Sequence, residues 1–293
     1  MIDTGSSDTT LAHTSLNDFS GDTISYSIPS GSENDYNGLY GDGSWWNGYL
    51  VRLETGLVGT SITAIAPIML MTSQSTSPIF ADGVTTDGLF GVAFEALSGA
   101  SSSPKTVMDA WYNAGVLSKN QLAFHGCPYN KEADSWIDIG NDTPYTACGN
   151  PTPVKIKIPV ASYVNFQLTS VLVGGTETSP GTPWQSGGYS FLDSCTSNIL
   201  LPTPVLNELV NQIKTGPGLS NNLKNSAYLT GWLGGTLTLK FSSTNIIWDL
   251  MPTLNFTIPS GYSEYSHVSL TLSARQYIQR SNDGWCKFQK MNF

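Results

Sequence analysis

The sequence carries little charge, and its charge is mostly of one sign. Only 12% of the 293 residues are charged, and 13 Lys and Arg stand against 22 Asp and Glu, giving a formal net charge of −9. Proteins that bind nucleic acid present clustered basic residues. The basic residues here are scattered, so we expect no nucleic-acid partner.

Long hydrophobic runs are also missing. A membrane-spanning helix needs about 20 consecutive apolar residues, and the longest apolar stretch, residues 65–71, contains Pro67. No signal peptide precedes the first motif. We expect no membrane segment within this chain, whereas the sequence leaves open an anchor outside it.

Cysteine and histidine are scarce, with four cysteines and three histidines. No pair of them has the spacing of a metal site, and no phosphate loop or dinucleotide fingerprint is present. We therefore expect neither a metal nor a cofactor. Cys127 and Cys148 bracket a polar loop, which predicts a local disulfide in an oxidising compartment.

Ser, Thr, Asn and Gly are abundant, and 40% of the residues are hydrophobic. This composition is typical of β-rich proteins that are secreted or lumenal, including those of lysosome-like compartments. The glycosylation sequons at Asn141 and Asn255 agree with a secreted glycoprotein. The length allows two domains of about 150 residues. A Gly- and Pro-rich segment at 149–153 predicts their boundary, with lobes at 1–150 and 151–293.

One short motif occurs twice. The chain opens with Ile2-Asp3-Thr4-Gly5-Ser6-Ser7, and a near copy follows at Phe191-Leu192-Asp193-Ser194-Cys195-Thr196-Ser197. Each has an apolar lead-in, an acid, a hydroxyl, a small residue and further hydroxyls. A single Asp-Thr-Gly is an ordinary turn sequence, but two such loops in two halves predict that two carboxylates meet at one site.

Strand patterns dominate the rest of the chain. Alternating apolar residues predict strands at 24–28 and 154–158, and a hairpin at 39–54 around Gly41-Asp42-Gly43-Ser44. Helical periodicity is limited to 104–114 and 204–214. We expect an all-β, bilobal protein with a few short helices and a cleft between the lobes.

Four landmarks, in this order, resemble the pepsin-like aspartic proteases: Asp3-Thr4-Gly5-Ser6-Ser7, the flap-like hairpin Tyr40-Gly41-Asp42-Gly43-Ser44, Asp87-Gly88-Leu89-Phe90-Gly91, and Asp193-Ser194-Cys195-Thr196. The second half is most similar to β-secretase, through Asp193-Ser194-x-Thr196-x-Asn198, Leu201-Pro202, Gln276-Tyr277 and Cys286-Lys287-Phe288. The resemblance spans nearly the whole chain and implies the bilobal pepsin-like acid protease fold.

The resemblance implies an aspartic-type endopeptidase. Asp3 and Asp193 would form the catalytic pair, which shares one proton because two adjacent carboxylates do not both ionise cheaply, a property known for pepsin itself. The pair would activate a water molecule by general acid–base catalysis. The partner would be an extended peptide or protein substrate, and the enzyme a monomer without a cofactor.

The resemblance also implies supporting roles for neighbouring residues. Ser6 and Thr196 would hydrogen-bond the outer carboxylate oxygens, and Gly5 would belong to the same support. Thr4 and Ser194 would tie the two loops together. Tyr40, with the flap turn Gly41, Asp42 and Gly43, would close over the substrate and exclude water.

The sequence departs from the family pattern in three ways. Cys195 replaces a glycine of the second loop, and Thr10 replaces a tryptophan. A family strand before the first Asp and further strands after Phe293 have no counterpart here, which implies a fold lacking its terminal strands. Two functions therefore stay open: an active endopeptidase, in this chain or in a longer one of which it is a part, and a catalytically impaired homologue that binds peptides. Cys195 favours impairment, because it adds a Cβ and a sulfur between the loops.

Overall fold

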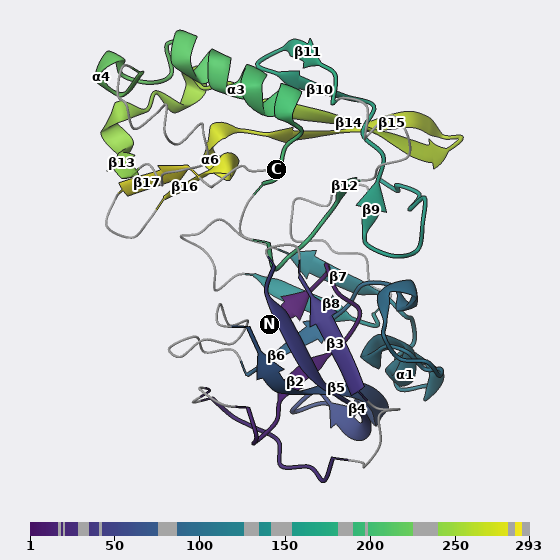
Figure 1. Cartoon of the computed structure of the whole chain (residues 1–293). Coiled ribbons are helices and arrows are strands. Elements are labelled where there is room, and N and C mark those ends of the chain that lie inside the picture. Colours follow the sequence, from purple (N-terminus) through teal and green to yellow (C-terminus); the bar gives the residue numbers. More distant parts are fainter. Residues whose placement is uncertain are drawn as a thin grey trace. The chain divides into compact units, whose positions relative to one another are not determined.

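The computed structural model of the protein describes residues 1–16, 19, 21–28, 35–40, 43–75, 87–125, 135–141, 154–180, 190–196, 199–224, 240–280 and 285–288. In this part the chain is mostly β with four short α-helices (Figure 1). It forms two compact units. The first comprises Met1–Thr152, Ala161–Val164 and Leu192–Cys195, and the second comprises Pro153–Val160, Asn165–Phe191 and Thr196–Phe293. Residues 192–195, which carry the second acid motif, thus pack with the first unit.

A six-stranded sheet forms the first unit. Its strands, in spatial order, are β1 (Ile2–Asp3), β6 (Gly88–Gly91), β2 (Thr10–Ala12), β5 (Thr63–Gln74), β4 (Trp45–Gly56) and β3 (Asp35–Leu39). Strand β1 runs parallel to β6, with Asp3 opposite Gly91. A separate hairpin joins β7 (Leu122–His125) to β8 (Trp136–Ile139). The first acid therefore ends an edge strand of the sheet.

The core of the first unit lies between β5 and the helix α1 (Val107–Asn113). Residues 66–71 of β5 are all buried, and Val107, Ala110 and Trp111 of α1 belong to the same apolar core. The helix begins three residues later than its sequence predicts, because Thr106 is the N-cap, its side chain accepting from the Asp109 N–H at 3.1 Å. A 3₁₀-helix, η2 (Glu95–Leu97), precedes it.

The hairpin expected over 39–54 is confirmed as β3 and β4. The Tyr40 N–H donates to the Ser44 carbonyl at 2.9 Å, and the Gly43 N–H donates back to the Tyr40 carbonyl at 3.0 Å. Gly43 has φ +86°, a left-handed conformation that favours glycine. Opposite the buried Trp46, a Cβ on Gly38 would lie 2.1 Å from the indole Nε1, so the ring needs glycine at that position.

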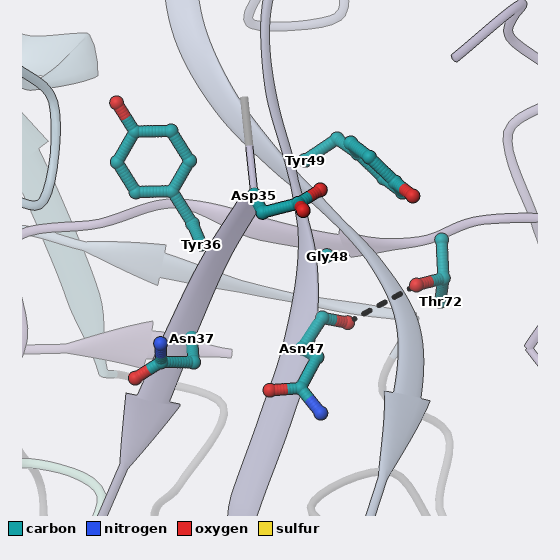
Figure 2. Close-up of a pocket in the computed structure, with 7 residues that line it drawn as sticks. All are labelled: Asp35, Tyr36, Asn37, Asn47, Gly48, Tyr49 and Thr72. Atoms are coloured by element: carbon teal, nitrogen blue, oxygen red, sulfur yellow. Dashed lines mark hydrogen bonds between the residues drawn. The ribbon is translucent and has the colours of Figure 1, made fainter. Parts of the chain in front are cut away.

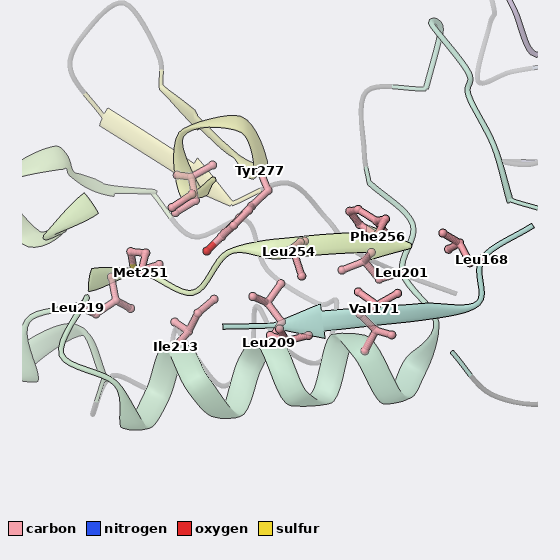
Figure 3. Packing of buried hydrophobic residues seen from close by; sticks show 14 of the residues in the cluster. Leu168, Val171, Leu201, Leu209, Ile213, Leu219, Met251, Leu254, Phe256 and Tyr277 are labelled. Atoms are coloured by element: carbon pink, nitrogen blue, oxygen red, sulfur yellow. The ribbon is translucent and has the colours of Figure 1, made fainter. Parts of the chain in front are cut away.

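The second unit contains a four-stranded sheet in the order β11 (Thr176–Thr178), β10 (Ser170–Val173), β14 (Leu254–Tyr262) and β15 (Tyr265–Leu272). The helix α3 (Thr203–Thr215) packs against this sheet, as Figure 3 shows, with Leu209 and Ile213 turned toward Val171 and Leu254. The helix expected over 204–214 is therefore confirmed, and its apolar face is the one that its periodicity predicts.

Smaller elements complete the second unit. They are the helices α4 (Asn221–Lys224) and α6 (Ala274–Tyr277), the 3₁₀-helices η4 (Ser243–Asn245) and η5 (Trp248–Leu250), the pair β9 (Asn165–Phe166) and β12 (Ser190–Phe191), and the sheet β13 (Lys240–Ser242), β17 (Trp285–Phe288) and β16 (Ile278–Arg280). Among the residues described, no helix is long and apolar enough to cross a membrane.

Two of the strand predictions, for residues 24–28 and 154–158, are wrong. In 24–28 only Ile24 forms an isolated bridge, to His13. Residues 154–158 form no strand, although the Lys157 N–H donates to the Ser260 carbonyl at 2.7 Å. Alternation of apolar residues indicates a suitable face, but a strand also needs a neighbour in register along its length.

Two polar groups of the second unit are buried. The Tyr277 side chain is fully buried and its hydroxyl donates to the Pro252 carbonyl at 2.6 Å. Burial strongly raises the pKa of Tyr277. The side-chain oxygen of Asn255, in the middle of β14, is buried and has no hydrogen-bond partner among the described residues.

Candidate active site

Asp3 is a buried acid held by two hydrogen bonds from its own loop. Its side chain is only 4% exposed. The Gly5 N–H donates to Oδ1 at 2.8 Å, and the Ser6 hydroxyl donates to Oδ2 at 2.6 Å. Burial raises the pKa of Asp3, the two hydrogen bonds oppose that shift, and the nearby Asp193 raises the pKa further.

Asp193 lies against this loop. A Cβ on Gly5 would come within 2.7 Å of the Asp193 Cγ and 2.9 Å of both its oxygens, so only glycine leaves room for the second carboxyl group. The Cys195 N–H donates to Asp193 Oδ1 at 2.9 Å. Each acid thus accepts a hydrogen bond from the N–H two residues further on, and the two motifs have matching local geometry.

Thr4 and Ser194 join the two loops by a reciprocal set of hydrogen bonds. The Thr4 N–H donates to Ser194 Oγ at 3.1 Å, and the Ser194 N–H donates to Thr4 Oγ1 at 2.9 Å. Each hydroxyl then donates to a carbonyl of the opposite loop: Thr4 to Leu192 at 2.9 Å, and Ser194 to Ile2 at 2.7 Å. Four hydrogen bonds therefore fix the spacing of the loops that carry the two acids.

Tyr40 lies in the electrostatic field of Asp3 and Asp8. Its half-buried ring packs against the apolar cluster that includes Trp46, and Cys195 packs against the same cluster. Burial raises the pKa of Tyr40 to about 12; a hydrogen bond with Trp46 opposes the shift, and the charge of Asp3 adds to it. Tyr40 therefore stays a neutral hydrogen-bonding group.

Of the remaining expected site residues, Thr196 is exposed and belongs to the second unit. Gly41 and Asp42 lie outside the described residues, and so do Cys127 and Cys148. Gly43 lies in the turn between β3 and β4, where it has a left-handed conformation.

Cys195 brings a free thiol to the acid pair. Its side chain is half-buried, and Sγ lies 3.4 Å from the Ile2 carbonyl, to which the thiol donates. Burial, followed by the charge of Asp3, raises the pKa of Cys195 to about 12. One ligand atom from each of Asp3, Asp193 and Cys195 lies within 4.8 Å of the other two. Asp193 and Cys195 belong to one loop, and Asp3 precedes them by about 190 residues, so the trio forms only where the two acid loops meet.

Asp8 is a further acid, half-buried, that the motifs do not predict. The Ser98 hydroxyl lies 2.6 Å from Asp8 Oδ1 and 2.9 Å from the Lys105 carbonyl, and it accepts the Ala100 N–H at 3.1 Å. Burial raises the pKa of Asp8, and the hydrogen bonds that Ser98 and Gly99 donate to its carboxylate oppose that shift.

An open depression of about 330 Å³ lies on the hairpin of β3 and β4 and on the neighbouring strand β5 (Figure 2). The Thr72 hydroxyl donates to the Asn47 carbonyl at its rim. The lining residues are Asp35, Tyr36 and Asn37 of β3, Asn47, Gly48 and Tyr49 of β4, and Thr72 of β5. Neither Asp3 nor Asp193 lines this depression, and Asp35 is its one acidic lining residue.

Comparison with known families gives one match. The family described as eukaryotic aspartyl protease matches residues 1–288, a range that includes both acid motifs and the flap hairpin. No curated protein matches the chain. The match confirms the resemblance to pepsin-like proteases at the level of the family, and the mostly β fold agrees with it.

Proposed function

The chain belongs to the eukaryotic aspartyl protease family, and from this premise we propose that it is an aspartic-type endopeptidase that cleaves extended peptides. The observation that supports this most is the close approach of Asp3 and Asp193, one of them 4% exposed, with matching N–H donors from Gly5 and Cys195. Such a pair in a partly dry site suits acid–base chemistry on a water molecule.

In the proposed mechanism the pair holds one proton between its carboxyl groups. The ionised member takes a proton from a water molecule lying between them, and the water oxygen attacks the peptide carbonyl. The protonated member donates to the carbonyl oxygen. The Ser6 hydroxyl and the Gly5 N–H hold Asp3 in place, and Thr4 and Ser194 keep the loops at a fixed spacing.

We assign to the flap the role of closing over the bound substrate. Tyr40 with Gly41, Asp42 and Gly43 would cover an extended peptide and exclude water. Thr196 would support Asp193 as Ser6 supports Asp3. These roles rest on the family pattern and on the neutral, half-buried state of Tyr40.

Single substitutions Asp3→Asn and Asp193→Asn test the proposal. Each should lower kcat/KM for peptide hydrolysis by about 10³-fold or more, because removal of one acid leaves no shared proton. Asp249→Asn is the matched control, since Asp249 is exposed in η5. Hydrolysis should be fastest at acid pH and slow as the pH rises past the raised pKa of Asp3. A single variant that keeps more than about a tenth of the activity would overturn the assignment.

One observation favours the alternative, a peptide-binding homologue with impaired catalysis. Cys195 places a Cβ and a sulfur beside both carboxyl groups, where the family pattern has glycine. Binding of a statine-type mimic without any peptide hydrolysis by the parent protein would select this alternative. Hydrolysis that disappears in Asp193→Asn would exclude it.

Several finer properties belong to the same proposal. We propose that the protein is a monomer with two lobes, 1–150 and 151–293, and that it is a secreted or lumenal glycoprotein. We also propose that its second half is most closely related to β-secretase.

A Cys127–Cys148 disulfide would stabilise the fold by about 3 kcal/mol. Mass spectrometry of a non-reduced digest tests it, and two free thiols would refute it.

A further inference from the structure

We propose that Asp3, Asp193 and Cys195 form a binding site for a thiophilic divalent cation such as Zn²⁺ or Cd²⁺, and that an ion bound there blocks peptide hydrolysis. The binding itself is independent of the proposed function, whereas the inhibition rests on it. The site consists of the two proposed catalytic acids and a residue that the family pattern does not supply.

The spacing of the ligand atoms fits such an ion. The three atoms lie within 4.8 Å of one another. In a tetrahedral zinc site, bonds of about 2.0–2.3 Å put ligand atoms roughly 3.4–3.7 Å apart. The difference is about 1.1–1.4 Å at most, which rotations of the side chains provide without moving the backbone. The trio can therefore supply three ligands, and water the fourth.

The surrounding hydrogen bonds hold two of these ligands in orientation. Asp3 is fixed by Gly5 and Ser6, and Asp193 by the backbone N–H of Cys195. Such second contacts to ligating carboxylates are a regular feature of metal sites. Because Asp193 and the thiol belong to one tight loop, binding needs no new loop conformation. Asp193 and Cys195 are half-buried, so the site is open to an ion from solvent.

Charge also favours a cation. The trio brings together three groups that each become negative on deprotonation, in a partly dry site. A divalent cation attracts all three negative groups and so offsets the repulsion between them. On binding, the thiol proton and the proton shared by the carboxyl groups pass to water, a metal–sulfur bond and metal–oxygen bonds form, and no electron transfer occurs. The ion then occupies the place of the water molecule that hydrolysis needs.

Cys195 determines which ions bind. Two carboxylates alone offer oxygen ligands, which suit Mg²⁺ and Ca²⁺ as well as heavier ions, whereas a thiolate selects for Zn²⁺, Cd²⁺ and Co²⁺. We therefore expect Mg²⁺ and Ca²⁺ to have little effect at concentrations where Zn²⁺ inhibits.

Cobalt absorption tests the binding without reference to activity. The full chain is titrated with Co²⁺ near neutral pH, and a thiolate-to-Co²⁺ charge-transfer band is sought in the near ultraviolet. We expect the band in the parent and its loss in Cys195→Ser and in Cys195→Gly. The other cysteines are unchanged in all three proteins, so a difference reports Cys195 alone. Circular dichroism identifies a variant that fails to fold, in which case the other variant decides.

Zinc inhibition of peptide hydrolysis is the second measurement. The concentration of Zn²⁺ that halves the rate should rise at least about tenfold in Cys195→Ser relative to the parent. An equal cobalt band in parent and Cys195→Ser, or no band in the parent, overturns the metal site whatever the activity. If the parent hydrolyses no peptide but shows the Cys195-dependent band, the proposed function fails and the metal site stands.

Discussion

The hydrogen bonds between Thr4 and Ser194 allow a quantitative prediction for Thr4→Val. Valine has nearly the shape of threonine but lacks the hydroxyl, which here accepts from the Ser194 N–H and donates to the Leu192 carbonyl, each at 2.9 Å. Thr4 is buried. Each backbone group left without a partner costs about 1–3 kcal/mol, and partial access to water favours the lower half of that range. We expect the free energy of unfolding to fall by about 2–4 kcal/mol.

The same substitution should affect the chemistry. The Leu192 carbonyl and the Ser194 N–H flank Asp193, so their release frees the second acid loop. A displacement of about 1 Å in a catalytic group lowers the rate on the order of 100-fold. We therefore expect Thr4→Val to lower kcat much more than it raises KM. Thr4→Ser, which keeps the hydroxyl, should stay close to the parent in both assays.

Thr60→Val provides a matched control. The Thr60 hydroxyl also donates to a carbonyl, of Leu57 at 2.8 Å, and accepts an N–H, from Ile62 at 3.1 Å, but Thr60 is exposed. Water replaces both partners, so this variant should lose less than about 1 kcal/mol. Urea unfolding and peptide hydrolysis measure the two effects. If Thr4→Val lost no more stability than Thr60→Val and kept its kcat, the tie between the loops would have no role in positioning the acids.

Three further predictions concern polar side chains. Because the pKa of Asp8 is raised, the folded protein keeps the Asp8 proton to a higher pH than the unfolded chain does. The stabilisation that this proton provides is full below the ordinary pKa of 3.8 and is lost as the pH rises through the raised pKa. The melting temperature of Asp8→Asn should therefore fall less over that pH window than the melting temperature of the parent protein. Glycopeptide mapping after secretory expression should find a glycan at the exposed Asn141 and none at Asn255, whose side-chain oxygen is buried in β14; the reverse pattern would contradict the register of that sheet. Tyr277→Phe leaves the Pro252 carbonyl unpaired and should lower the free energy of unfolding by about 1–2 kcal/mol with kcat unchanged.

Local patterns in the sequence predict much of the fold. The hairpin at 39–54 and the helix at 204–214 are both confirmed, because turn glycines and an apolar stripe every three to four residues act within a short stretch of chain. The repeated acid motif predicts that two carboxylates meet, since a rare combination of residue types occurs twice. The order of four landmarks predicts the family, which the match over 1–288 confirms.

Most of the sequence-based predictions that fail concern structure that depends on contacts between residues far apart in the chain. Residues 24–28 and 154–158 have the alternation of strands, but they lack continuous partners in register. The start of α1 is displaced for a local reason, because Thr106 is its N-cap. Asp8 gives no signal in the sequence, because its contact with Ser98 joins residues 90 positions apart.

By itself, the sequence determines the two acid loops, the hydroxyls beside them and the family. In each loop the acid accepts a hydrogen bond from the N–H two residues further on. Because this hydrogen bond lies within a few neighbouring residues, the local sequence defines it. The tertiary structure alone decides that residues 192–195 pack with the first unit and that the Cys195 thiol comes within ligand distance of both carboxyl groups. The physical reason is that the two acid loops lie about 190 residues apart in the sequence. The sheet and the reciprocal hydrogen bonds of Thr4 and Ser194 bring these loops together, and no local residue pattern specifies the resulting distances between their side chains.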